Sequence, residues 1–407
     1  MVNGEKIPSM LNFQKTIPLS LYLHLPWCVK KCPYCDFNSH EIGRRPVRER
    51  EYIDALIRDL EFELPRIWGR RMLSLFIGGG TPSLFSPEAL AHLMAALRAR
   101  LTISPDIEIT LEANPGTAEA ARFRGYRELG VNRLSIGIQS FNDDHLKRLG
   151  RIHDSAEARA AVDMAHDAGF EDINLDLMFG LPQQSPREAL ADLQAAIDCQ
   201  PHHISWYQLT IEPNTVFYSR PPALPGDDAA WEMQQQGQRQ LEECGFRQYE
   251  ISAYAMDGHP CVHNLNYWQF GDYLGLGAGA HGKITDVAAG SVTRFARHRI
   301  PEAYMRKAGT AEVITETRRL GREDLALEFM MNALRLTDGV PPLLFLERTG
   351  LPLNCIRPEL EQAESRGLIA WDIHRIKPTA LGQRYLNDLL QIFMPEVMVN
   401  KELSNEQ

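Results

Sequence analysis

The chain has 407 residues, 44% of them hydrophobic, so it can bury a large core and is too long for one ordinary domain. Its formal net charge is −10, and no basic run is long enough to indicate a nucleic-acid-binding surface. Seven cysteines in so long a chain exclude a disulfide scaffold and favour a reducing compartment with a metal site.

Strand and helix patterns alternate through the first half of the chain and a little beyond. Short apolar runs predict strands at residues 19–25, 73–77, 106–112, 133–138, 172–177 and 203–209. Helical patterns and start signals between or after them predict helices at residues 48–64, from Pro87, at 117–129, at 155–168, from Ser185 and at 228–244. Six strand–helix units predict a parallel sheet with helical crossovers, and six rather than eight predict an α/β fold with an incomplete (β/α)6 TIM-like barrel.

Polar and glycine-rich positions fall where the expected strands end. They are the loop with three cysteines after the first strand, Gly78–Gly80 after the second, Glu112 at the end of the third, Gln139 after the fourth and Asp176 late in the fifth. Barrels of this kind carry their chemistry at the carboxyl ends of the strands. We therefore expect one site that gathers these residues.

The pattern changes near residue 300. Helical stretches at 322–335 and 356–366, followed by a hairpin near 367–377, predict a small winged-helix-like module whose acidity argues against DNA binding. The expected division is an N-terminal segment at 1–18, a barrel domain at 19–300, a C-terminal domain at 301–395 and a frayed tail at 396–407.

Cys28, Cys32 and Cys35 form a short C-x3-C-x2-C motif in the loop after the first strand. Closely spaced thiolates can hold a [4Fe–4S] cluster, and three ligands for four irons leave one iron open for S-adenosylmethionine. A structural zinc ion is the alternative, with His24 or His40 as the fourth ligand. The preceding strand and the glycine turn after the next strand favour the iron–sulfur interpretation.

A family resemblance rests on several motifs together. They are Tyr22-x-His24-x-Pro26-x-Cys28-x3-Cys32-x-Tyr34-Cys35, Gly78–Pro82, Glu112-Ala-Asn-Pro115, Gly137-Ile-Gln139-Ser-Phe141, Arg151 and Asp176–Pro182. With these motifs the chain resembles the radical-SAM superfamily, and within it the coproporphyrinogen dehydrogenase-like branch, from about residue 19 to residue 390. The resemblance implies a [4Fe–4S] cluster and S-adenosylmethionine as cofactors.

Three features distinguish the two main groups of that branch. The coproporphyrinogen III dehydrogenases resemble C-x3-C-x2-C-x-C, but Phe37 stands here at the position of their fourth cysteine. The dehydrogenases also have a substantial extension before the first strand. In this chain only about 18 residues precede that strand. Finally, residues 263–268 match the HNxxYW signature of the HemW heme chaperones. The chain is therefore similar to the HemW family.

That resemblance implies a heme chaperone that binds heme and transfers it to acceptor proteins. The alternative is an oxygen-independent coproporphyrinogen III dehydrogenase, or another radical-SAM oxidoreductase of porphyrin metabolism. Whether the chain is an enzyme stays open, although Phe37 argues against coproporphyrinogen oxidation. The implied partners are heme-acceptor proteins, respiratory and membrane-associated ones among them, and no nucleic acid; a homodimer stays open. We expect a cytoplasmic protein because no leader or apolar span is visible.

The resemblance also implies roles for individual residues. The cluster ligands are Cys28, Cys32 and Cys35, and the residues expected around S-adenosylmethionine are Tyr22, Tyr34, Asp36, Gly79, Gly80, Thr81, Glu112, Gln139, Arg151 and Asp176. Tyr22 is expected near the methionine part, Tyr34 against the adenine and Arg151 on the carboxylate. Gln139 and Asp176 would hold the ribose or a second nucleotide. Asp176 as a polar layer residue of the barrel core stays an alternative.

His263 is the implied heme ligand, because imidazole ligates heme iron directly. Tyr267 and Trp268 could then cover a porphyrin face. The alternative is that His263 caps a turn and Trp268 fills the core, and Cys261 is a weaker second ligand. Residues 277–282 satisfy G-x-G-x-x-G, but no fresh βαβ unit contains them, so we interpret them as a tight loop near the cluster.

Overall fold

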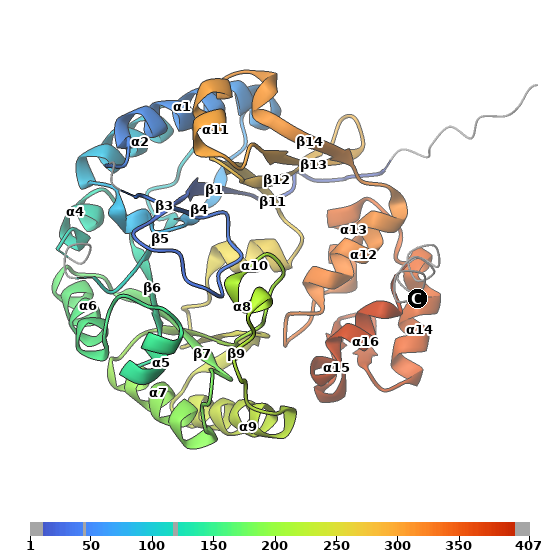
Figure 1. The fold of residues 1–407 in the computed structure, drawn as a ribbon. Helices are drawn as coiled ribbons and strands as arrows, with labels where there is room; N and C mark the ends of the chain where they lie inside the picture. Colours follow the sequence, from blue (N-terminus) through green and yellow to red (C-terminus); the bar gives the residue numbers. More distant parts are fainter. Residues whose placement is uncertain (1–10, 44–45, 117–120, 395–407) are drawn as a thin grey trace, which may run out of the picture.

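The computed structural model describes residues 11–43, 46–116 and 121–394. Within them, one mixed sheet of twelve strands has seven parallel neighbours in the order β11-β1-β4-β5-β6-β7-β8. These strands are β1 Leu19–Leu25, β4 Met72–Gly79, β5 Glu108–Ala113, β6 Arg133–Gln139, β7 Asp172–Phe179, β8 His203–Gln208 and β11 Asp272–Leu276. They curve into an open ring (Figure 1). The partial α/β barrel expected from the sequence is confirmed.

The sequence prediction missed half of the sheet. Beyond the six expected strands the structure has the parallel strand β11 and five antiparallel strands: β9 Arg247–Glu250, β10 Ala253–Ala255, β12 His281–Asp286, β13 Ser291–Arg297 and β14 Ile314–Arg319. The sheet is therefore mixed and not wholly parallel. Strands of three to seven residues give too short a pattern for periodicity to separate them from loops.

Helices cover the outer side of the ring (Figure 1). They include α1 Glu49–Ile67, α2 Pro87–Arg100, α4 Phe123–Glu128, α5 Asp143–Arg148, α6 Ser155–Asp167, α7 Pro186–Asp198 and α9 Asp227–Glu243. The predicted start signals are present, because Ser86 Oγ accepts a hydrogen bond from the Ala89 amide at 3.2 Å and Ser185 forms a capping box with Glu188. The helix expected at 117–129 is seen from Phe123, and residues 117–120 lie outside the described residues.

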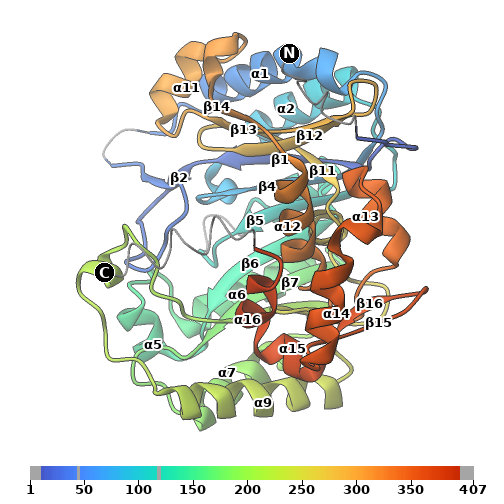
Figure 2. The ribbon, with the colours of Figure 1, turned by 90° about the vertical axis from the view of Figure 1, so that its right-hand side faces the viewer.

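The open side of the ring is closed by two other parts of the chain. Helix α10 (Val262–Trp268) lies inside the ring, and the C-terminal helices stand in the gap (Figure 1). Those C-terminal elements are α12 Arg322–Ala333, α13 Pro342–Thr349, α14 Arg357–Ser365, β15 Ile369–Trp371, β16 Ile376–Pro378, α15 Ala380–Arg384 and α16 Leu386–Gln391. They form a layer beside the sheet (Figure 2). The backbone of Glu250 in β9 pairs with that of Leu336, which joins the large sheet to the C-terminal elements.

Most of the second hydrophobic core comes from Leu320 onward, including Phe329 and Phe345 of the C-terminal helices, and earlier parts of the chain add Phe13, Ile17, Phe270 and Val292. Residues just before Leu320 still belong to the large sheet, because β14 pairs with β13. Helix α11 (Pro301–Lys307) packs on α1 of the barrel. The stretch 301–319, which the sequence grouped with the C-terminal domain, therefore packs with the barrel. We propose that the domain boundary lies near residue 320.

A buried carboxylate ties β11 to its neighbours. Asp272 is fully buried and accepts hydrogen bonds from Arg70 Nη2 at 2.8 Å, Lys283 Nζ at 3.2 Å and Thr285 Oγ1 at 2.8 Å. Its backbone carbonyl accepts from Asn266 Nδ2 of α10 at 3.0 Å. Buried charges are tolerated when they are paired in this way. Asp272 therefore links helix α10 to the barrel and also links strand β11 to β12.

We expect Asp272→Ala to lower the free energy of unfolding by about 3–5 kcal/mol, because it leaves the buried Lys283 ammonium without its carboxylate. Urea denaturation followed by circular dichroism measures this change. The matched control is Asp257→Ala, because the Asp257 side chain is 92% exposed and its loss should change stability by no more than about 0.5 kcal/mol. Equal effects of the two substitutions would contradict the anchoring role of Asp272.

Candidate functional site

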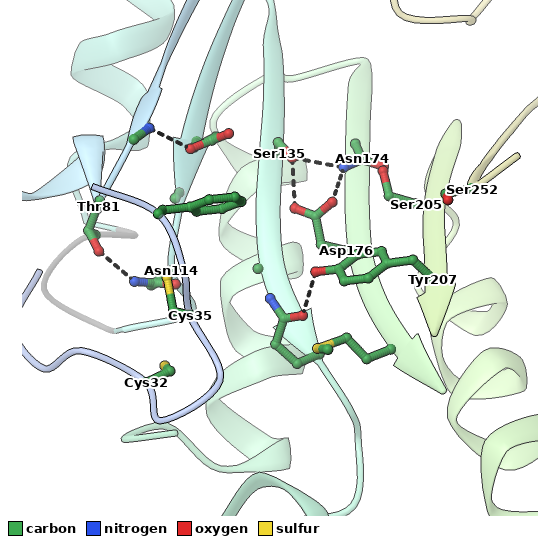
Figure 3. Close-up of a pocket in the computed structure, with 18 of the residues that line it drawn as sticks. Cys32, Cys35, Thr81, Asn114, Ser135, Asn174, Asp176, Ser205, Tyr207 and Ser252 are labelled. Atoms are coloured by element: carbon green, nitrogen blue, oxygen red, sulfur yellow. Dashed lines mark hydrogen bonds between the residues drawn. The ribbon is translucent and has the colours of Figure 1, made fainter. Parts of the chain in front are cut away.

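A cavity of about 630 Å³ opens at the carboxyl ends of the parallel strands. Of the residues expected in the site, it is lined by Cys28, Cys32, Tyr34, Cys35, Asp36, Gly79, Gly80, Thr81, Glu112, Gln139, Arg151 and Asp176. Figure 3 shows the cysteine loop on one side of the cavity and the polar side chains of β6, β7 and β8 on the other. The parallel register thus brings twelve predicted residues to one place.

The loop with the three cysteines folds back on itself. The short strands β2 (Trp27–Cys28) and β3 (His40–Glu41) pair and close it. All three thiols are free and half-buried. No three His, Cys, Asp or Glu side chains of the described residues stand close enough to share one metal ion. A cubane cluster places no such demand, because each thiolate binds a different iron at a corner of the cube.

The two histidines considered as zinc ligands are engaged elsewhere. His24 uses Nδ1 on the Tyr22 hydroxyl at 3.0 Å and Nε2 on the Asn38 carbonyl at 2.9 Å. His40 Nε2 contacts the carbonyl of Arg299 at 3.2 Å. A tetrahedral zinc site would need one of these rings as its fourth ligand. The donor set therefore fits three cluster ligands and one open iron better than it fits zinc.

The glycine turn after β4 lies tightly against the cysteine loop. A Cβ at Gly80 would stand 2.6 Å from the Trp27 carbonyl oxygen, and one at Gly79 would stand 2.9 Å from His24 Cε1. Gly79 also has φ +123°, which side-chain-bearing residues rarely adopt. Its amide donates to Glu112 Oε2 at 3.0 Å. Glycine is therefore required here for the backbone to reach the pocket.

Arg151 places a positive charge beside the cysteine loop. Its Nη2 donates to Asn114 Oδ1 at 2.8 Å and to the Gly137 carbonyl at 2.6 Å, and its Nη1 lies 3.6 Å from Cys32 Sγ. Its Nε is buried and has no hydrogen-bond partner among the described residues. A buried donor without a partner costs free energy, so its presence points to a ligand acceptor such as a carboxylate.

A polar network forms the opposite wall (Figure 3). Asp176 accepts hydrogen bonds from Ser135 Oγ at 2.9 Å and Asn174 Nδ2 at 3.0 Å. Asn174 Oδ1 accepts in turn from Ser205 Oγ at 3.0 Å and faces His203 Nδ1 at 2.6 Å. Since a carbonyl oxygen only accepts, His203 carries its proton on Nδ1. This network lets a carboxylate stay buried inside the barrel.

The sequence analysis did not select Asn114, Ser135, Asn174 or Tyr207, which also line the cavity. A signal exists for Ser135 and Asn174, because polar or glycine residues recur at every second position of β6 and at 172, 174 and 176 of β7, as expected for one face of a strand. Tyr207 of β8 donates to Gln139 Oε1 of β6 at 3.0 Å, so a strand two places along the sheet fixes this glutamine side chain. Gln139 has φ +71°, a strained conformation that functional sites often contain.

Two predicted residues lie outside the cavity wall. The Tyr22 hydroxyl lies 3.0 Å from His24 Nδ1, and the Tyr22 ring stacks on that of Phe76. His263 contacts Ser74 Oγ through Nδ1 at 3.1 Å, and its ring stands 4.9 Å from that of Phe76. Phe37, at the position of the missing fourth cysteine, lies at the cavity mouth with 61% of its surface exposed.

Helix α10, which carries the HNxxYW residues, is capped from the barrel. Cys261 supplies no side-chain cap, and Glu108 of β5 instead accepts the amides of Val262 at 2.8 Å and His263 at 2.9 Å. Asn264 and Trp268 face the cavity. Arg335, two residues after the end of α12, stacks on the Trp268 ring at 4.3 Å. Cavity, signature helix and C-terminal domain are therefore in direct contact.

The G-x-G-x-x-G stretch is the loop between β11 and β12. Asn38 Nδ2 of the cysteine loop donates to the Ala278 carbonyl at 2.9 Å, and a Cβ at Gly277 would stand 2.3 Å from the His24 carbonyl oxygen. The stretch is therefore a tight packing loop behind the cysteines, as predicted.

Comparison with known proteins agrees with this geometry. Residues 22–196 match the radical SAM superfamily, and residues 320–385 match the HemN C-terminal domain. The heme chaperone HemW of Haemophilus influenzae is 50% identical over 386 residues, which cover 94% of this chain and 99% of that protein. This chain belongs to the HemW family. HemW of Escherichia coli is 49% identical over 382 residues, which cover 94% of this chain and 100% of that protein.

A solved structure shows the same fold. Coproporphyrinogen III oxidase HemN from Escherichia coli superposes with a TM-score of 0.79 at 24% identity, over 93% of this chain and 90% of that one. The radical-SAM fold with a HemN-type C-terminal domain, predicted from the motifs, is thus confirmed for this HemW relative. None of the helices in the described part of the chain is long and apolar enough to cross a membrane.

The Glu112 carboxyl provides a test of the site's electrostatics. Burial and, secondarily, the Asp176 carboxylate raise the pKa of Glu112 from 4.5 to about 7. The folded state then binds more protons than the unfolded state between these values, so stability falls as pH rises through this window. We expect Glu112→Gln to gain on the order of 1–2 kcal/mol relative to the wild type between pH 5 and pH 8.

Urea denaturation of both proteins at the two pH values measures this difference. Glu88→Gln on α2 is the matched control, because Glu88 is exposed and its replacement should leave the pH dependence unchanged. A Glu112→Gln variant that follows the wild-type pH profile would mean that this carboxyl ionises as freely as in water.

Proposed function

We propose that the chain is a heme chaperone that holds a [4Fe–4S] cluster, S-adenosylmethionine and heme, and passes the heme to acceptor proteins. The main support is the cavity in which three half-buried cysteines face a glycine turn and the unpartnered Nε of Arg151. A further support is that the chain is 50% identical to the heme chaperone HemW of Haemophilus influenzae over 386 residues. Both observations favour the same assignment.

Different residues of the cavity would bind the cluster and the nucleotide. Cys28, Cys32 and Cys35 would hold three irons, and the glycine turn would let a ligand approach the backbone closely. Arg151 would bind the carboxylate of S-adenosylmethionine through its free Nε. A cluster held there would supply, when reduced, the electron for reductive cleavage of S-adenosylmethionine. Glu112, neutral or ionised near pH 7, would serve as hydrogen-bond donor or acceptor for it.

Two observations favour a second function, the oxidation of a porphyrinogen. The fold matches the coproporphyrinogen III oxidase HemN over 93% of this chain, and the cavity is deep enough to extend from the cysteines to Trp268 of α10. Phe37 at the position of the fourth cysteine argues against that oxidation, since a phenyl ring at the mouth offers neither a ligand nor an acid–base group.

Heme-acceptor proteins are the proposed partners, because the HemW relatives are named heme chaperones. We also propose that the protein works in the cytoplasm. The support is that all seven cysteines are unpaired, as in a reducing compartment.

The cluster assignment predicts that anaerobic reconstitution gives a brown protein with about four irons and four sulfides per chain. Replacement of Cys28, Cys32 and Cys35 by Ala should abolish both, and replacement of the exposed Cys244 should leave both unchanged. Iron and acid-labile sulfide analysis provides the measurement. Protein that carries one zinc and no sulfide would overturn the assignment.

The chaperone assignment predicts heme transfer without porphyrinogen oxidation. Heme-loaded protein, mixed with an apo-cytochrome, should lose its Soret absorption as the acceptor gains one. The same protein, incubated anaerobically with reductant, S-adenosylmethionine and coproporphyrinogen III, should form no protoporphyrinogen. Turnover in the second assay would favour the dehydrogenase, and failure of the wild type to bind heme at all would remove the chaperone assignment.

A further inference from the structure

Asn114 stands at the rim of the cavity beside the cysteine loop, as the first residue after strand β5. It lines the cavity together with Glu112, two positions earlier on the same face of the chain. Pro115 follows, and a proline restricts the residue before it to extended backbone. The sequence therefore continues the strand geometry by one residue and places an amide in the cavity wall.

The amide of Asn114 joins two segments of that wall. Its Nδ2 donates to Thr81 Oγ1 of the glycine turn at 2.8 Å (Figure 3), and its Oδ1 accepts from Arg151 Nη2 at 2.8 Å. A guanidinium only donates, so Oδ1 has to face Arg151 and Nδ2 has to face Thr81. The direction of both hydrogen bonds is therefore fixed by their chemistry.

The Thr81 hydroxyl accepts from Asn114 and so keeps its own proton for another acceptor. Thr81 is 2% exposed, and its backbone amide donates to the Trp27 carbonyl at 2.7 Å, directly before Cys28. Burial raises the pKa of the Cys28 thiol, and a hydrogen bond from Thr81 acts in the opposite direction. The acceptor for the Thr81 proton is therefore the Cys28 sulfur.

Arg151 is held through two of its three nitrogens. Nη2 donates to Asn114 and also to the Gly137 carbonyl at 2.6 Å, and Nη1 lies 3.6 Å from Cys32 Sγ. The fit is close, since a Cβ at Gly137 would stand 3.3 Å from Asn114 Oδ1. With both Nη atoms engaged the guanidinium has one orientation, and Nε is the nitrogen left for a ligand.

We propose that Asn114 is a positioning residue for both cofactors. It holds Arg151 with Nε free for the carboxylate of S-adenosylmethionine, and it turns the Thr81 hydroxyl toward Cys28. The inference rests on the proposed cluster and nucleotide, and it names the residue that aligns their contacts with the protein.

One amide then controls the hydrogen bonds to two of the three cluster thiolates, those of Cys28 and Cys32. Hydrogen bonds to the sulfurs stabilise the more negative, reduced cluster and so raise its reduction potential. Loss of Asn114 should therefore lower the potential and also weaken nucleotide binding. A side chain that only fills space would not link these two properties.

Asn114→Leu, which is nearly equal in size, removes both hydrogen bonds. The full-length protein is reconstituted anaerobically, and its iron and sulfide are counted. Calorimetric titration with S-adenosylmethionine should show about tenfold weaker binding, as for the loss of a hydrogen bond to a charged group. A redox titration followed by electron paramagnetic resonance should give a more negative potential. Asn387→Leu, at an exposed position of α16, is the control and should change neither.

Asn114→Asp separates alignment from packing. Its carboxylate still accepts from Arg151, so nucleotide affinity should return most of the way to the wild-type value. It has no N–H for Thr81, whose hydroxyl then donates to the new carboxylate, so the potential should stay more negative than in the wild type.

Wild-type nucleotide affinity in cluster-loaded Asn114→Leu would contradict the proposal, as would an Asn114→Asp protein that binds no better than Asn114→Leu. Affinity is expressed per assembled cluster, and Asn114→Ala replaces Asn114→Leu if the added methyl groups hinder assembly. A wild type that assembles no cluster or binds no S-adenosylmethionine would instead reject the proposed function, so the two failures are distinguishable.

Discussion

The parallel register of the seven central strands determines where everything else lies. Because neighbouring strands run the same way, their carboxyl ends meet at one rim, and the cysteine loop, the glycine turn and Glu112 come together although 84 positions separate Cys28 from Glu112. The same register gathers the amino ends at the opposite rim, where a second cavity of about 550 Å³ lies. The barrel thus has two separate ends, and different residues line the cavity at each end.

An open barrel leaves a gap that must be closed. Here α10 lies inside the ring and the C-terminal helices stand in the gap. Arg335 contacts Trp268 of α10, and Leu336 pairs with Glu250 of β9. Buried polar groups make this closure specific, because Asp272 and Glu108 accept hydrogen bonds that only this placement of α10 offers. The HNxxYW helix is therefore held at a fixed place inside the barrel.

Local patterns predicted much of the fold and of the site. The six βα units, the caps at Ser86 and Ser185 and the cysteine motif are short-range signals, and the structure agrees with them. Strand β11 could not be found in this way, since its partner β1 lies some 250 positions earlier. For the same reason the sequence missed that Tyr22 turns to His24 and that Glu108 caps α10, because both depend on which residues the closed barrel brings together.

Helix α10 is only seven residues long and stands between the two cavities: Asn264 and Trp268 border one, and Val262 borders the other. A rigid partition of this kind has a thermodynamic consequence. Any ligand that tilts the helix on one side alters the affinity on the other, and linkage makes the effect mutual. The two ends of this barrel therefore share one short piece of backbone.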